Sequence, residues 1–436
     1  MNERSMSTPL VQASLSARAG WAANAPIAAL MQQALDNPEL ISLAAGFVDV
    51  GSLPATAALS AVSSLLSHPQ LAQSALQYGS VCGDTALREL LLQRLLAQDA
   101  ADPQAPRAPN PASLEQVVLS AGSNQLLAMV ADALLDPGDC VVCDGPSYFV
   151  FTGLVESVGA RCLAVAADAD GMRVDALEQL LAAHASAGTL ERIKAIYTVS
   201  YFDNPRGVSL ARDRRAALVA LAERYSRAHR IYVIEDAAYR ELRFSGLDQA
   251  SVRAYDTNGE TVIYAGTFSK TFSPGLRVGF GVLPKSLAPA VSAIKGNIDF
   301  GSPYLNQCIL AQALRLGLYE PHVERLRALY ARKAQCMLAA LDEQLAPLGV
   351  CSYERPSGGL YIWLSLPSHV NTGPDGELFA RARAAGVLYV PGQYCYPSGP
   401  EQSTSGMRLS FGVQSEERIQ LGVQKLAVAI ADVVGG

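Results

Sequence analysis

Lys270 stands in a short segment that brings together an amine, several hydroxyl groups and a guanidinium. The segment begins at Thr267, ends at Arg277 and reads Thr-Phe-Ser-Lys-Thr-Phe-Ser-Pro-Gly-Leu-Arg. Pro274 and Gly275 interrupt any regular structure between the lysine and the arginine. Because an amine forms a Schiff base with a carbonyl, and because hydroxyls and a guanidinium bind an anion, this segment suits a ligand with both groups. Pyridoxal 5′-phosphate (PLP) has an aldehyde and a phosphate and is such a ligand.

A carboxyl group and an amide stand close to the ends of two other apolar stretches. Asp236 follows the apolar segment 231–235, where a buried carboxylate is costly unless it is paired. A pyridinium N–H would pair with it, whereas the simpler alternative is that Asp236 caps a following helix. Asn204, within residues 203–207, could bond the phenolic oxygen of a PLP ring. Its alternative is an ordinary turn, since Asn-Pro and Gly favour turns.

Two further polar residues suit a phosphate and a carboxylate. Ser123 lies between an expected strand and an expected helix, and a free helix N-terminus binds a phosphate through its N–H groups and its dipole. The alternative is that Ser123 only caps that helix. Arg408 lies inside an apolar run, and the planar guanidinium fork matches the two oxygens of a carboxylate. The alternative here is a strand arginine that pairs with a local acid.

The composition narrows the class of protein. A chain of 436 residues predicts two domains, or a large and a small one, and a formal net charge of -6 argues against nonspecific nucleic-acid binding. The polar N-terminus lacks the apolar core of a signal peptide, and no apolar run approaches a membrane span. We therefore expect a cytoplasmic protein without a nucleic-acid or membrane partner.

The cysteines and histidines argue against a metal or redox site. The eight cysteines are scattered, and the one close pair, Cys140 and Cys143, lies in an expected strand where residues three apart point to opposite faces. None of the five histidines lies within four residues of another. We expect reduced cysteines and no bound metal.

Hydrophobic patterning predicts an α/β fold. From about residue 114 to 305, apolar runs alternate with helical spacing, which is typical of a mostly parallel sheet covered by helices. The expected strands are 116–120, 140–144, 193–199, 231–235 and 262–265, and the expected helices are 123–135 and 211–227. Later helices and the expected strands 361–364 and 407–411 form a smaller α+β domain. We also expect a helix at 26–35 and an Ala- and Pro-rich surface loop at 99–111.

In their order along the chain, these motifs resemble the fold-type I PLP-dependent aminotransferases of class I/II. The resemblance covers about residues 40 to 436, and the leader before it looks most like the 2-aminoadipate/kynurenine branch. The motifs are Tyr-Gly at 78, Gly-Ser at 122, Asn-Pro-x-Gly at 204, Asp-x-x-Tyr at 236, Ser-Lys at 269 with Arg277, and Arg408. The resemblance implies an N-terminal arm (1–45) that packs with the small domain or a partner subunit, a large PLP-binding domain (46–305) and a small domain (306–436).

The resemblance assigns catalytic and ring-binding roles to residues of this chain. Lys270 would form the internal aldimine and then carry the proton between the substrate α-carbon and C4′ of the cofactor. Asp236 would pair with the pyridine nitrogen, and Tyr239 and Asn204 would bond O3′ of the ring. Tyr148 would stack on the ring face.

Further roles concern the phosphate and the substrate. The phosphate would be held by Ser123, Asn124, Thr267, Ser269 and Arg277. Tyr78 would reach the phosphate of the neighbouring subunit, which implies a homodimer with shared active sites. Arg408 would bind the substrate α-carboxylate, with Gly46 and Asn204 lining the same place.

The expected activity is transfer of an amino group between an L-amino acid and a 2-oxo acid. A different PLP reaction (elimination, decarboxylation or oxidation in secondary metabolism) uses the same lysine, aspartate and arginine and stays open. Asp203 and Arg206 depart from the family pattern, and they either retune side-chain preference or pair with each other. Ala28 stands where 2-aminoadipate-type enzymes often carry arginine, which weakens the case that a dicarboxylic side chain is bound there. A PLP-sensing transcription regulator would need a more basic DNA-binding leader, and a degenerate homologue would not keep every polar cofactor position.

Overall fold

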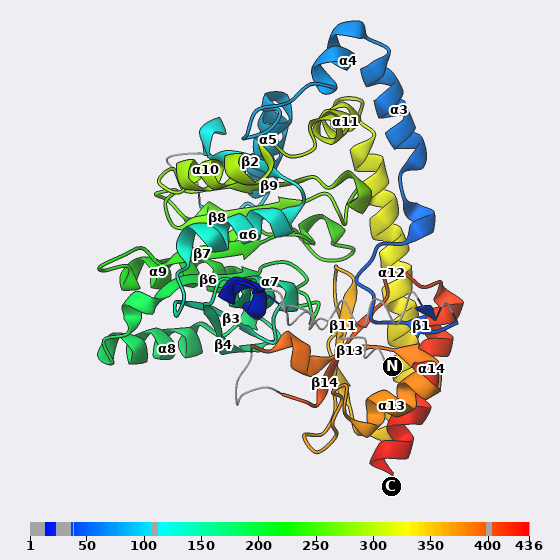
Figure 1. Ribbon diagram of the computed structural model, residues 1–436. Helices are drawn as coiled ribbons and strands as arrows, with labels where there is room; N and C mark the ends of the chain where they lie inside the picture. The colour runs from blue at the N-terminus through cyan, green and yellow to red at the C-terminus, as the bar shows by residue number, and fades with distance from the viewer. Residues whose placement is uncertain (1–13, 23–35, 38, 107–111, 398–402, 436) are drawn as a thin grey trace, which may run out of the picture.

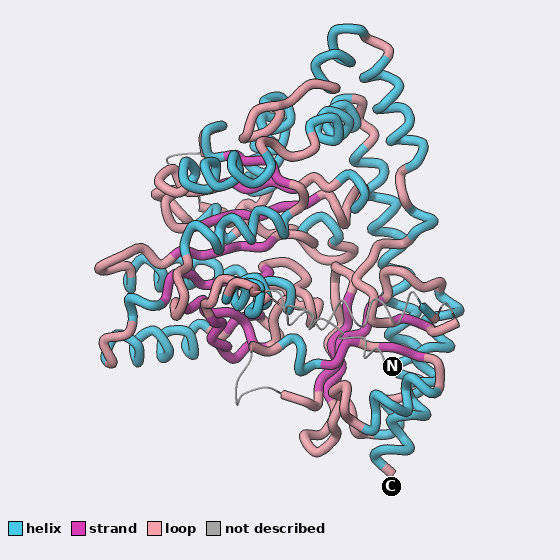
Figure 2. The backbone as a smooth tube through the Cα atoms, viewed as in Figure 1, coloured by secondary structure: helices cyan, strands magenta, loops and turns pink. Residues whose placement is uncertain are grey.

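A large sheet and a small sheet, each covered by helices, form the protein (Figure 1; Figure 2). The computed structural model describes residues 14–22, 36–37, 39–106, 112–397 and 403–435. The large sheet is mixed and the helices pack on it, so the predicted α/β class is confirmed. The expected domain boundaries at residues 45 and 305 stay predictions.

The large sheet has eight strands in the order β2-β9-β8-β7-β6-β3-β4-β5. β8, β7, β6, β3 and β4 are mutually parallel, while β9 runs antiparallel to both of its neighbours and β5 antiparallel to β4. The strands are β2 (Val117–Ser120), β3 (Cys140–Gly145), β4 (Arg161–Asp168), β5 (Gly171–Met172), β6 (Ile193–Val199), β7 (Tyr232–Asp236), β8 (Val262–Thr267) and β9 (Gly279–Val282). All five strands expected for this region are present, within about one or two residues of the predicted bounds at either end.

Helices bury both faces of this sheet because alternate strand residues point to opposite sides. In β3, Cys140 and Val142 pack into the cluster that α8 and α9 cover, whereas Val141 and Cys143 pack into the cluster that includes α6 and α7. The expectation that the two cysteines face opposite sides is confirmed. The helices around the large sheet are α5 (Thr85–Ala100), α6 (Ser123–Leu134), α7 (Phe149–Ser157), α8 (Val174–Ser186), α9 (Arg212–Tyr225) and α10 (Ala288–Asp299).

The topology brings the polar strand ends to one edge of the large sheet. β6, β7 and β8 are parallel, so Val199, Asp236 and Thr267 end at the same edge. β2 is antiparallel to β9, as β8 is, and its end at Ser120 therefore lies at this edge too. Ligands of open α/β sheets bind at such edges, and this arrangement gathers the predicted residues there.

The small sheet is antiparallel, with the order β10-β11-β14-β13. It places Arg408 opposite Trp363 in β11 and opposite Val390 in β13. β1 pairs with β12, which ties residue 41 to residue 387. The elements of this part are β1 (Ile41–Ser42), α11 (Tyr304–Arg315), α12 (Tyr319–Gln344), β10 (Ser352–Tyr353), β11 (Tyr361–Ser365), α13 (Glu377–Ala384), β12 (Val387–Leu388), β13 (Val390–Pro391), β14 (Gly406–Ser410) and α14 (Glu416–Val434).

Short helices complete the described chain. The 3-10 helices are η1 (Val50–Ser52), η2 (Leu114–Gln116), η3 (Leu190–Arg192), η4 (Arg240–Leu242), η5 (Val252–Tyr255), η6 (Pro274–Leu276), η7 (Ala346–Leu348) and η8 (Gly392–Cys395). In the leader, Ser16 accepts a hydrogen bond from the Ala19 N–H and caps α1 (Ala17–Trp21). The sequence analysis did not predict this helix. The helix expected at 26–35 lies outside the described residues.

The surface loop expected at residues 99–111 is wrong in its first part. Helix α5 continues to Ala100, and both Asp99 and Asp102 are buried. Asp99 accepts hydrogen bonds from the N–H and the hydroxyl of Ser251 at 2.9 and 2.7 Å. The Ala- and Pro-rich composition indicated a loop, but these long-range hydrogen bonds stabilise buried carboxylates. Residues 107–111 lie outside the described residues.

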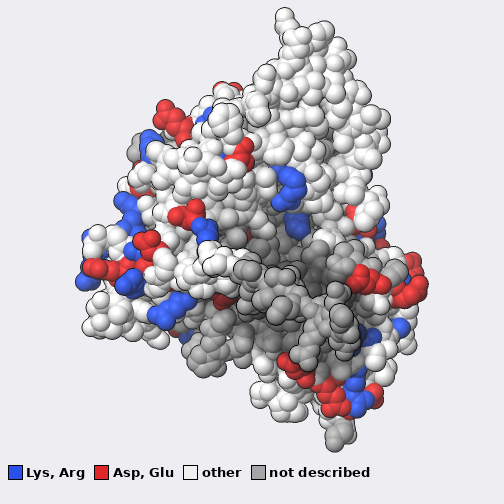
Figure 3. Space-filling view, in the orientation of Figure 1, with Lys and Arg blue, Asp and Glu red and all other residues white. Residues whose placement is uncertain are grey.

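Helices α3 (Ala55–Leu66) and α4 (Pro69–Ala75) form an uncharged projection at the top of Figure 1. No Asp, Glu, Lys or Arg occurs between Asp49 and Asp84, and Figure 3 shows this part without charged side chains in that view. Within the described residues, no single helix is long and apolar enough to cross a membrane. Residues 50–66 and 69–75 reach that length and composition only when taken together, across a 109° bend.

Candidate active site

A cavity of about 210 Å³ lies at the edge of the large sheet where the parallel strands end. It brings together all the predicted cofactor-binding residues except Tyr78. Its lining consists of Phe47, Ser123, Asn124, Tyr148, Val199, Asn204, Asp236, Ala238, Tyr239, Thr267, Ser269, Lys270, Pro274 and Arg277. Of the three predicted substrate residues, Asn204 lines the cavity, and Gly46 and Arg408 bond directly to members of this set.

Lys270 lies in a tight loop directly after β8. The Thr267 hydroxyl accepts a hydrogen bond from the Ser269 N–H at 3.2 Å, and Phe268 and Phe272 are buried on either side of the lysine. The turn therefore has apolar anchors while the half-buried lysine faces the cavity. Its Nζ donates to the carbonyl oxygen of Gly46 at 2.6 Å, so the amine is held in place by the segment that follows β1.

Asp236 is the last residue of β7 and is buried. Its carboxylate accepts hydrogen bonds from the Tyr197 hydroxyl and from the Ala238 N–H, both at 3.1 Å. Burial raises the pKa of Asp236 to about 6, and nearby Glu235 adds to this, while the hydrogen bond from Tyr197 opposes it. Because both donors are neutral, a cationic N–H donor in the cavity would bind this carboxylate strongly.

The predicted phosphate-binding residues lie at the end of the cavity where α6 begins. Gly122, at a φ of 82°, occupies the cap position, and Ser123 is the first residue of the helix. The interpretation of Ser123 as the cap is therefore wrong. A Cβ on Gly122 would lie 2.5 Å from an Arg277 nitrogen, so glycine lets the guanidinium approach the helix N-terminus. Arg277 donates to the Ala121 carbonyl at 3.1 Å and to the Ser269 hydroxyl at 3.4 Å.

Arg408 is buried in β14 beside the cavity. Its two terminal nitrogens donate to the side-chain oxygen of Asn204 at 2.8 Å and to the Ala44 carbonyl at 2.6 Å. Its Nε is buried and has no hydrogen-bond partner among the described residues. Pairing of Arg408 with a local acid is therefore wrong. The guanidinium carbon lies 4.4 Å from the ring centre of Tyr361 and 5.3 Å from that of Phe149.

Two tyrosines contribute hydroxyl groups to the cavity. Tyr239 is buried, and its hydroxyl lies 3.1 Å from the hydroxyl of Tyr361. Burial, followed by the nearby phenols of Tyr361 and Tyr148, raises the pKa of Tyr239 well above its usual range. Tyr148 is half-buried and donates to the Asn124 side chain at 3.4 Å. Both phenols therefore remain neutral donors near neutral pH.

Tyr78 lies outside this cavity. Its side chain is 81% exposed and packs edge-on against Phe300, with the ring centres 5.9 Å apart. Both residues line a separate surface pocket of about 490 Å³. Within one chain, the structure does not bring Tyr78 to the other predicted phosphate-binding residues.

Asp203 and Arg206, the two departures from the family pattern, pair with each other. They are buried, and the guanidinium donates to the carboxylate at 3.0 Å. A second arginine nitrogen donates to the Asp168 carbonyl at 2.9 Å. Of the two roles that the sequence left open, the structure supports mutual pairing.

Some cavity residues were not found from the sequence. Phe47, Val199, Ala238 and Pro274 also line the cavity, and each directly follows or lies close to a predicted residue, which was the available signal. Tyr197 and Tyr361 carried no such signal. Tyr197 and Tyr361 read as ordinary strand positions, and which groups they meet depends on tertiary packing.

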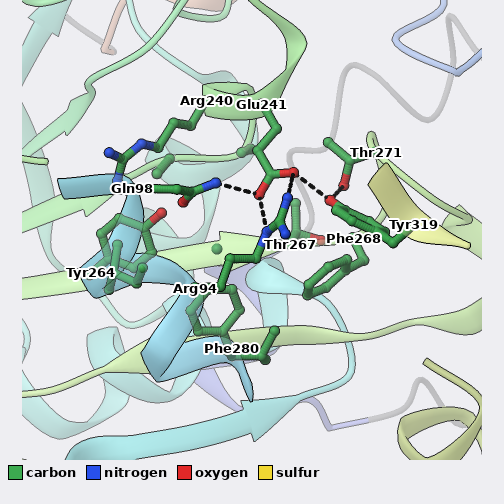
Figure 4. A pocket seen from close by; sticks show the side chains of 15 residues that line it. Arg94, Gln98, Arg240, Glu241, Tyr264, Thr267, Phe268, Thr271, Phe280 and Tyr319 are labelled. Atoms are coloured by element: carbon green, nitrogen blue, oxygen red, sulfur yellow. Dashed lines mark hydrogen bonds and ion pairs between the residues drawn. The ribbon is translucent and has the colours of Figure 1, made fainter. Parts of the chain in front are cut away.

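A closed polar cluster, the Glu241 cluster (Arg94, Gln98, Glu241, Thr271 and Tyr319), lies behind the lysine loop (Figure 4). Arg94 donates to the Glu241 carboxylate with two nitrogens, at 2.9 and 3.0 Å. Tyr319 donates to the same carboxylate at 2.7 Å, and its hydroxyl lies 2.8 Å from that of Thr271. Because Thr271 follows Lys270 directly, this cluster anchors one side of the lysine loop. The cavity within it measures only about 30 Å³.

Comparison with known proteins identifies the family. Residues 38–426 match the family model for aminotransferase class I and II, and the chain belongs to this family. It is 31% identical over 361 residues to aromatic-amino-acid aminotransferase 1 of Thermococcus litoralis, which covers 83% of this chain and 81% of that protein. It is 36% identical over 319 residues to 2-aminoadipate transaminase of Thermus thermophilus, which covers 72% and 75%.

A solved structure agrees over almost the whole chain. The crystal structure of Pyrococcus horikoshii kynurenine aminotransferase in complex with PMP has a TM-score of 0.87 and 30% identity, and the match covers 96% of this chain and 97% of that one. The predicted resemblance to fold-type I aminotransferases is thus confirmed. The chain is an enzyme that uses PLP and transfers an amino group between an amino acid and a 2-oxo acid.

The described residues fit this cofactor. Asp236 is a buried carboxylate whose hydrogen-bond donors among the described residues, Tyr197 and Ala238, are neutral, which suits a protonated pyridine nitrogen. The N-terminus of α6 and Arg277 meet across Gly122, which suits a phosphate. Lys270 presents an amine to the same cavity, as a Schiff base with the aldehyde requires.

Proposed function

We propose that the cavity around Lys270 is the active site of this aminotransferase and that the predicted residues act there in the roles described below. The observation that carries this proposal is the position of the Lys270 amine, the Asp236 carboxylate and the α6 N-terminus around one cavity of about 210 Å³. When bound, PLP supplies an aldehyde that reacts with amines and a ring that accepts electrons.

Lys270 and Asp236 have different roles in proton transfer: Lys270 moves a proton, and Asp236 keeps one in place. With PLP bound, the Lys270 amine would act as the general acid–base that moves the proton between the substrate α-carbon and C4′ of the cofactor. The Asp236 carboxylate keeps a proton on the pyridine nitrogen, because an ionised partner favours the charged form of that nitrogen. Burial of Asp236 supports this role, since a buried carboxylate gains strongly from a cationic donor.

The remaining cofactor contacts orient PLP. Tyr239 and Asn204 bond O3′; because the Asn204 oxygen accepts from Arg408, its NH₂ group is left to donate. Tyr148 stacks on the ring. The phosphate is bound by Ser123, Asn124, Thr267, Ser269 and Arg277, which surround the N-terminus of α6.

Arg408 binds the substrate α-carboxylate, and Gly46 and Asn204 line that place. The buried Nε of Arg408 has no hydrogen-bond partner in the described part of the chain, and such a donor gains from a ligand oxygen. A Cβ on Gly46 would lie 2.8 Å from the Tyr361 hydroxyl and 3.8 Å from an Arg408 nitrogen. Glycine at this position therefore leaves room beside the guanidinium.

We also propose that the transferred amino acid has an uncharged side chain. Arg206, the basic departure from the family pattern, is neutralised by Asp203, and the cations that line the described cavity are Lys270 and Arg277. The named activities of the two relatives differ on this point, aromatic amino acids for one and 2-aminoadipate for the other. A kcat/KM for phenylalanine above that for 2-aminoadipate supports this proposal, and the reverse order contradicts it.

A homodimer with shared active sites accounts for the apolar projection and for Tyr78. Leu59 and Leu76 are 68% and 69% exposed on α3 and after α4, and such apolar surfaces usually mark an interface. Mixing Tyr78→Ala with Lys270→Ala subunits tests sharing. A mixed dimer with shared sites has one site that carries neither substitution, so activity returns, whereas unshared sites give no recovery. A cytoplasmic location and the lack of a nucleic-acid partner stay predictions from composition.

A labelling experiment and an absorbance measurement test the main proposal. Purified protein is loaded with PLP, reduced with borohydride and digested, and the phosphopyridoxyl label should appear on Lys270. Loaded protein incubated with an amino acid should then convert to the pyridoxamine form with release of the 2-oxo acid. A label on another residue contradicts the assigned site. Release of ammonia or of a decarboxylated product would show a different PLP reaction.

A further inference from the structure

The hydroxyl of Tyr361 lies at the meeting point of the proposed cofactor and substrate sites. Tyr361 begins β11 in the small sheet and is buried. Its hydroxyl lies 3.1 Å from that of Tyr239, with the two rings edge-on at 82°. The face of its ring contacts the Arg408 guanidinium. One side chain of the small sheet thus touches both the tyrosine proposed to bond O3′ and the arginine proposed to bind the carboxylate.

The ring and the hydroxyl of Tyr361 have separable contacts. A phenylalanine at this position would occupy the same space as the tyrosine ring and would keep the contact with Arg408. The hydroxyl adds one proton and two lone pairs, and among the described residues its hydrogen-bond partner is Tyr239. Any effect of the Tyr361 hydroxyl on the cavity therefore passes through Tyr239.

A pair of hydroxyl groups can share its protons in two ways. If Tyr239 donates to Tyr361, its proton is used and it has only lone pairs to offer a third oxygen. If Tyr361 donates to Tyr239, the proton of Tyr239 is free for that third oxygen. A hydroxyl that accepts one hydrogen bond also donates a stronger one, because the chain is polarised.

We propose that Tyr361 is a positioning residue that donates its hydroxyl proton to Tyr239 and so directs the Tyr239 proton to O3′ of bound PLP. This inference rests on the proposed function of the cavity. Tyr361 does not touch the reacting atoms in this arrangement, since its effect passes through Tyr239. It gives the small sheet a direct influence on the acidity of the cofactor.

The expected consequence is a change in a protonation equilibrium. The nitrogen that joins Lys270 to PLP is protonated more easily when the neighbouring O3′ carries more negative charge. A donor to O3′ draws that charge away and lowers the pKa of the nitrogen. Removing the Tyr361 hydroxyl weakens this donor, so the pKa should rise. Loss of the whole hydrogen bond to O3′ would correspond to about half a unit to one unit. Because the Tyr361 hydroxyl strengthens that bond by about 10–30%, its removal should raise the pKa by about 0.1–0.3 unit.

The test is a spectrophotometric pH titration of PLP-loaded protein, which needs no turnover. Tyr361→Phe should titrate about 0.1–0.3 unit higher than the wild type. The matched control is Tyr389→Phe, which removes a buried hydroxyl bonded to the Thr372 carbonyl at 2.9 Å, outside the cavity lining. It should titrate like the wild type.

A double-mutant cycle separates action through Tyr239 from any direct effect. In a Tyr239→Phe background, the further change Tyr361→Phe should leave the pKa unmoved. An unshifted pKa for Tyr361→Phe alone, or an equal shift in both backgrounds, overturns the inference. Wild-type protein that forms no Lys270–PLP absorbance band contradicts the proposed function instead, so the two failures are distinguishable.

Discussion

Two acids, the buried Asp236 and the half-buried Glu241, lie close together in sequence but in different surroundings. Asp236 faces a cavity of about 210 Å³ and accepts hydrogen bonds from two neutral donors. Glu241 lies in the closed cluster of Figure 4, beside a cavity of about 30 Å³, and accepts two hydrogen bonds from Arg94 and one each from Gln98 and Tyr319. One site has room for a ligand, and the other is filled by its own side chains.

The pKa values of the two acids shift in opposite directions for this reason. Burial raises the pKa of Asp236 to about 6. Burial acts in the same direction on Glu241, but the hydrogen bonds and charge of Arg94 outweigh it, so the pKa of Glu241 falls below its ordinary value of 4.5. A buried acid with a cationic partner contributes to the stability of the fold, whereas one without such a partner is ready for a cationic ligand.

The two regions meet at the lysine loop. Lys270 reaches into the open cavity, and the next residue, Thr271, places its hydroxyl 2.8 Å from that of Tyr319 in the closed cluster. The closed cluster thus holds the backbone from which the reactive side chain projects. Such a rigid support keeps a catalytic group in its productive geometry.

The largest effect is expected from Lys270→Ala. Turnover should fall by about 10³- to 10⁴-fold, because both the amine that joins PLP and the proton carrier are lost. The free energy of unfolding of the cofactor-free protein should change by less than about 1 kcal/mol, since Lys270 is half-buried. Steady-state transamination and chemical denaturation measure the two quantities. A near wild-type rate would contradict the assignment of the site.

Glu241→Gln should cause the largest loss of stability. At pH 7 the free energy of unfolding should fall by about 2–3 kcal/mol, because the half-buried Arg94 loses its charge-assisted hydrogen bonds to Glu241 and keeps only the more exposed Glu320 as a carboxylate partner. The folded pKa of Glu241 is lowered, so its contribution is present above pH 4.5 and is lost as the pH falls through the folded pKa. The difference between variant and wild type should therefore shrink on acidification.

Glu320→Gln is the control for this prediction. Glu320 also bonds Arg94, but its side chain is 51% exposed, and an exposed ion pair contributes at most about 1 kcal/mol. Urea denaturation of both variants from pH 7 down to pH 4 checks the order and the pH trend. Equal losses for the two variants would show that the lower exposure of Glu241 does not make its ion pair with Arg94 stronger than that of Glu320.

Asp236→Asn should stabilise the cofactor-free protein at neutral pH. The folded pKa is raised from 3.8 to about 6, so the contribution of Asp236 is present below about pH 4 and is lost as the pH rises through 6. A shift of about two units corresponds to a loss of up to about 3 kcal/mol by pH 8, which the amide avoids. Denaturation with and without PLP measures this: the variant should be more stable without PLP and gain less from it. If the cofactor-free variant is less stable than the wild type at pH 8, the prediction that ionised Asp236 destabilises the cofactor-free fold is wrong.

Arg408→Lys should have the smallest effect of these four. The ammonium keeps the charge but loses the two-pronged contact with a carboxylate, so we expect a loss of about 2 kcal/mol in amino-acid binding, or about 30-fold in KM. The absorbance of the PLP-loaded protein should stay unchanged. A fall in kcat with an unaltered KM would place Arg408 in a different role.

Much of the site was predictable because its residues stand at strand ends. Asp236, Asn204, Thr267 and Ser123 each follow or end an apolar run, and parallel strands bring such positions to one edge. The wrong expectations came from composition and local rules. The Ala- and Pro-rich stretch suggested a loop at Asp99, which in fact lies in α5 and bonds Ser251.

The sequence by itself determined the strand–helix alternation, the lysine segment and the set of polar groups, because these depend on local patterns and residue chemistry. Only the tertiary structure decided which groups meet. Lys270 bonds the carbonyl of Gly46, 224 positions away, and Arg408 bonds Asn204 across 204 positions. The contact between Tyr239 and Tyr361 is of the same kind. Such partners depend on how the two sheets pack, and packing joins side chains without regard to their separation along the chain.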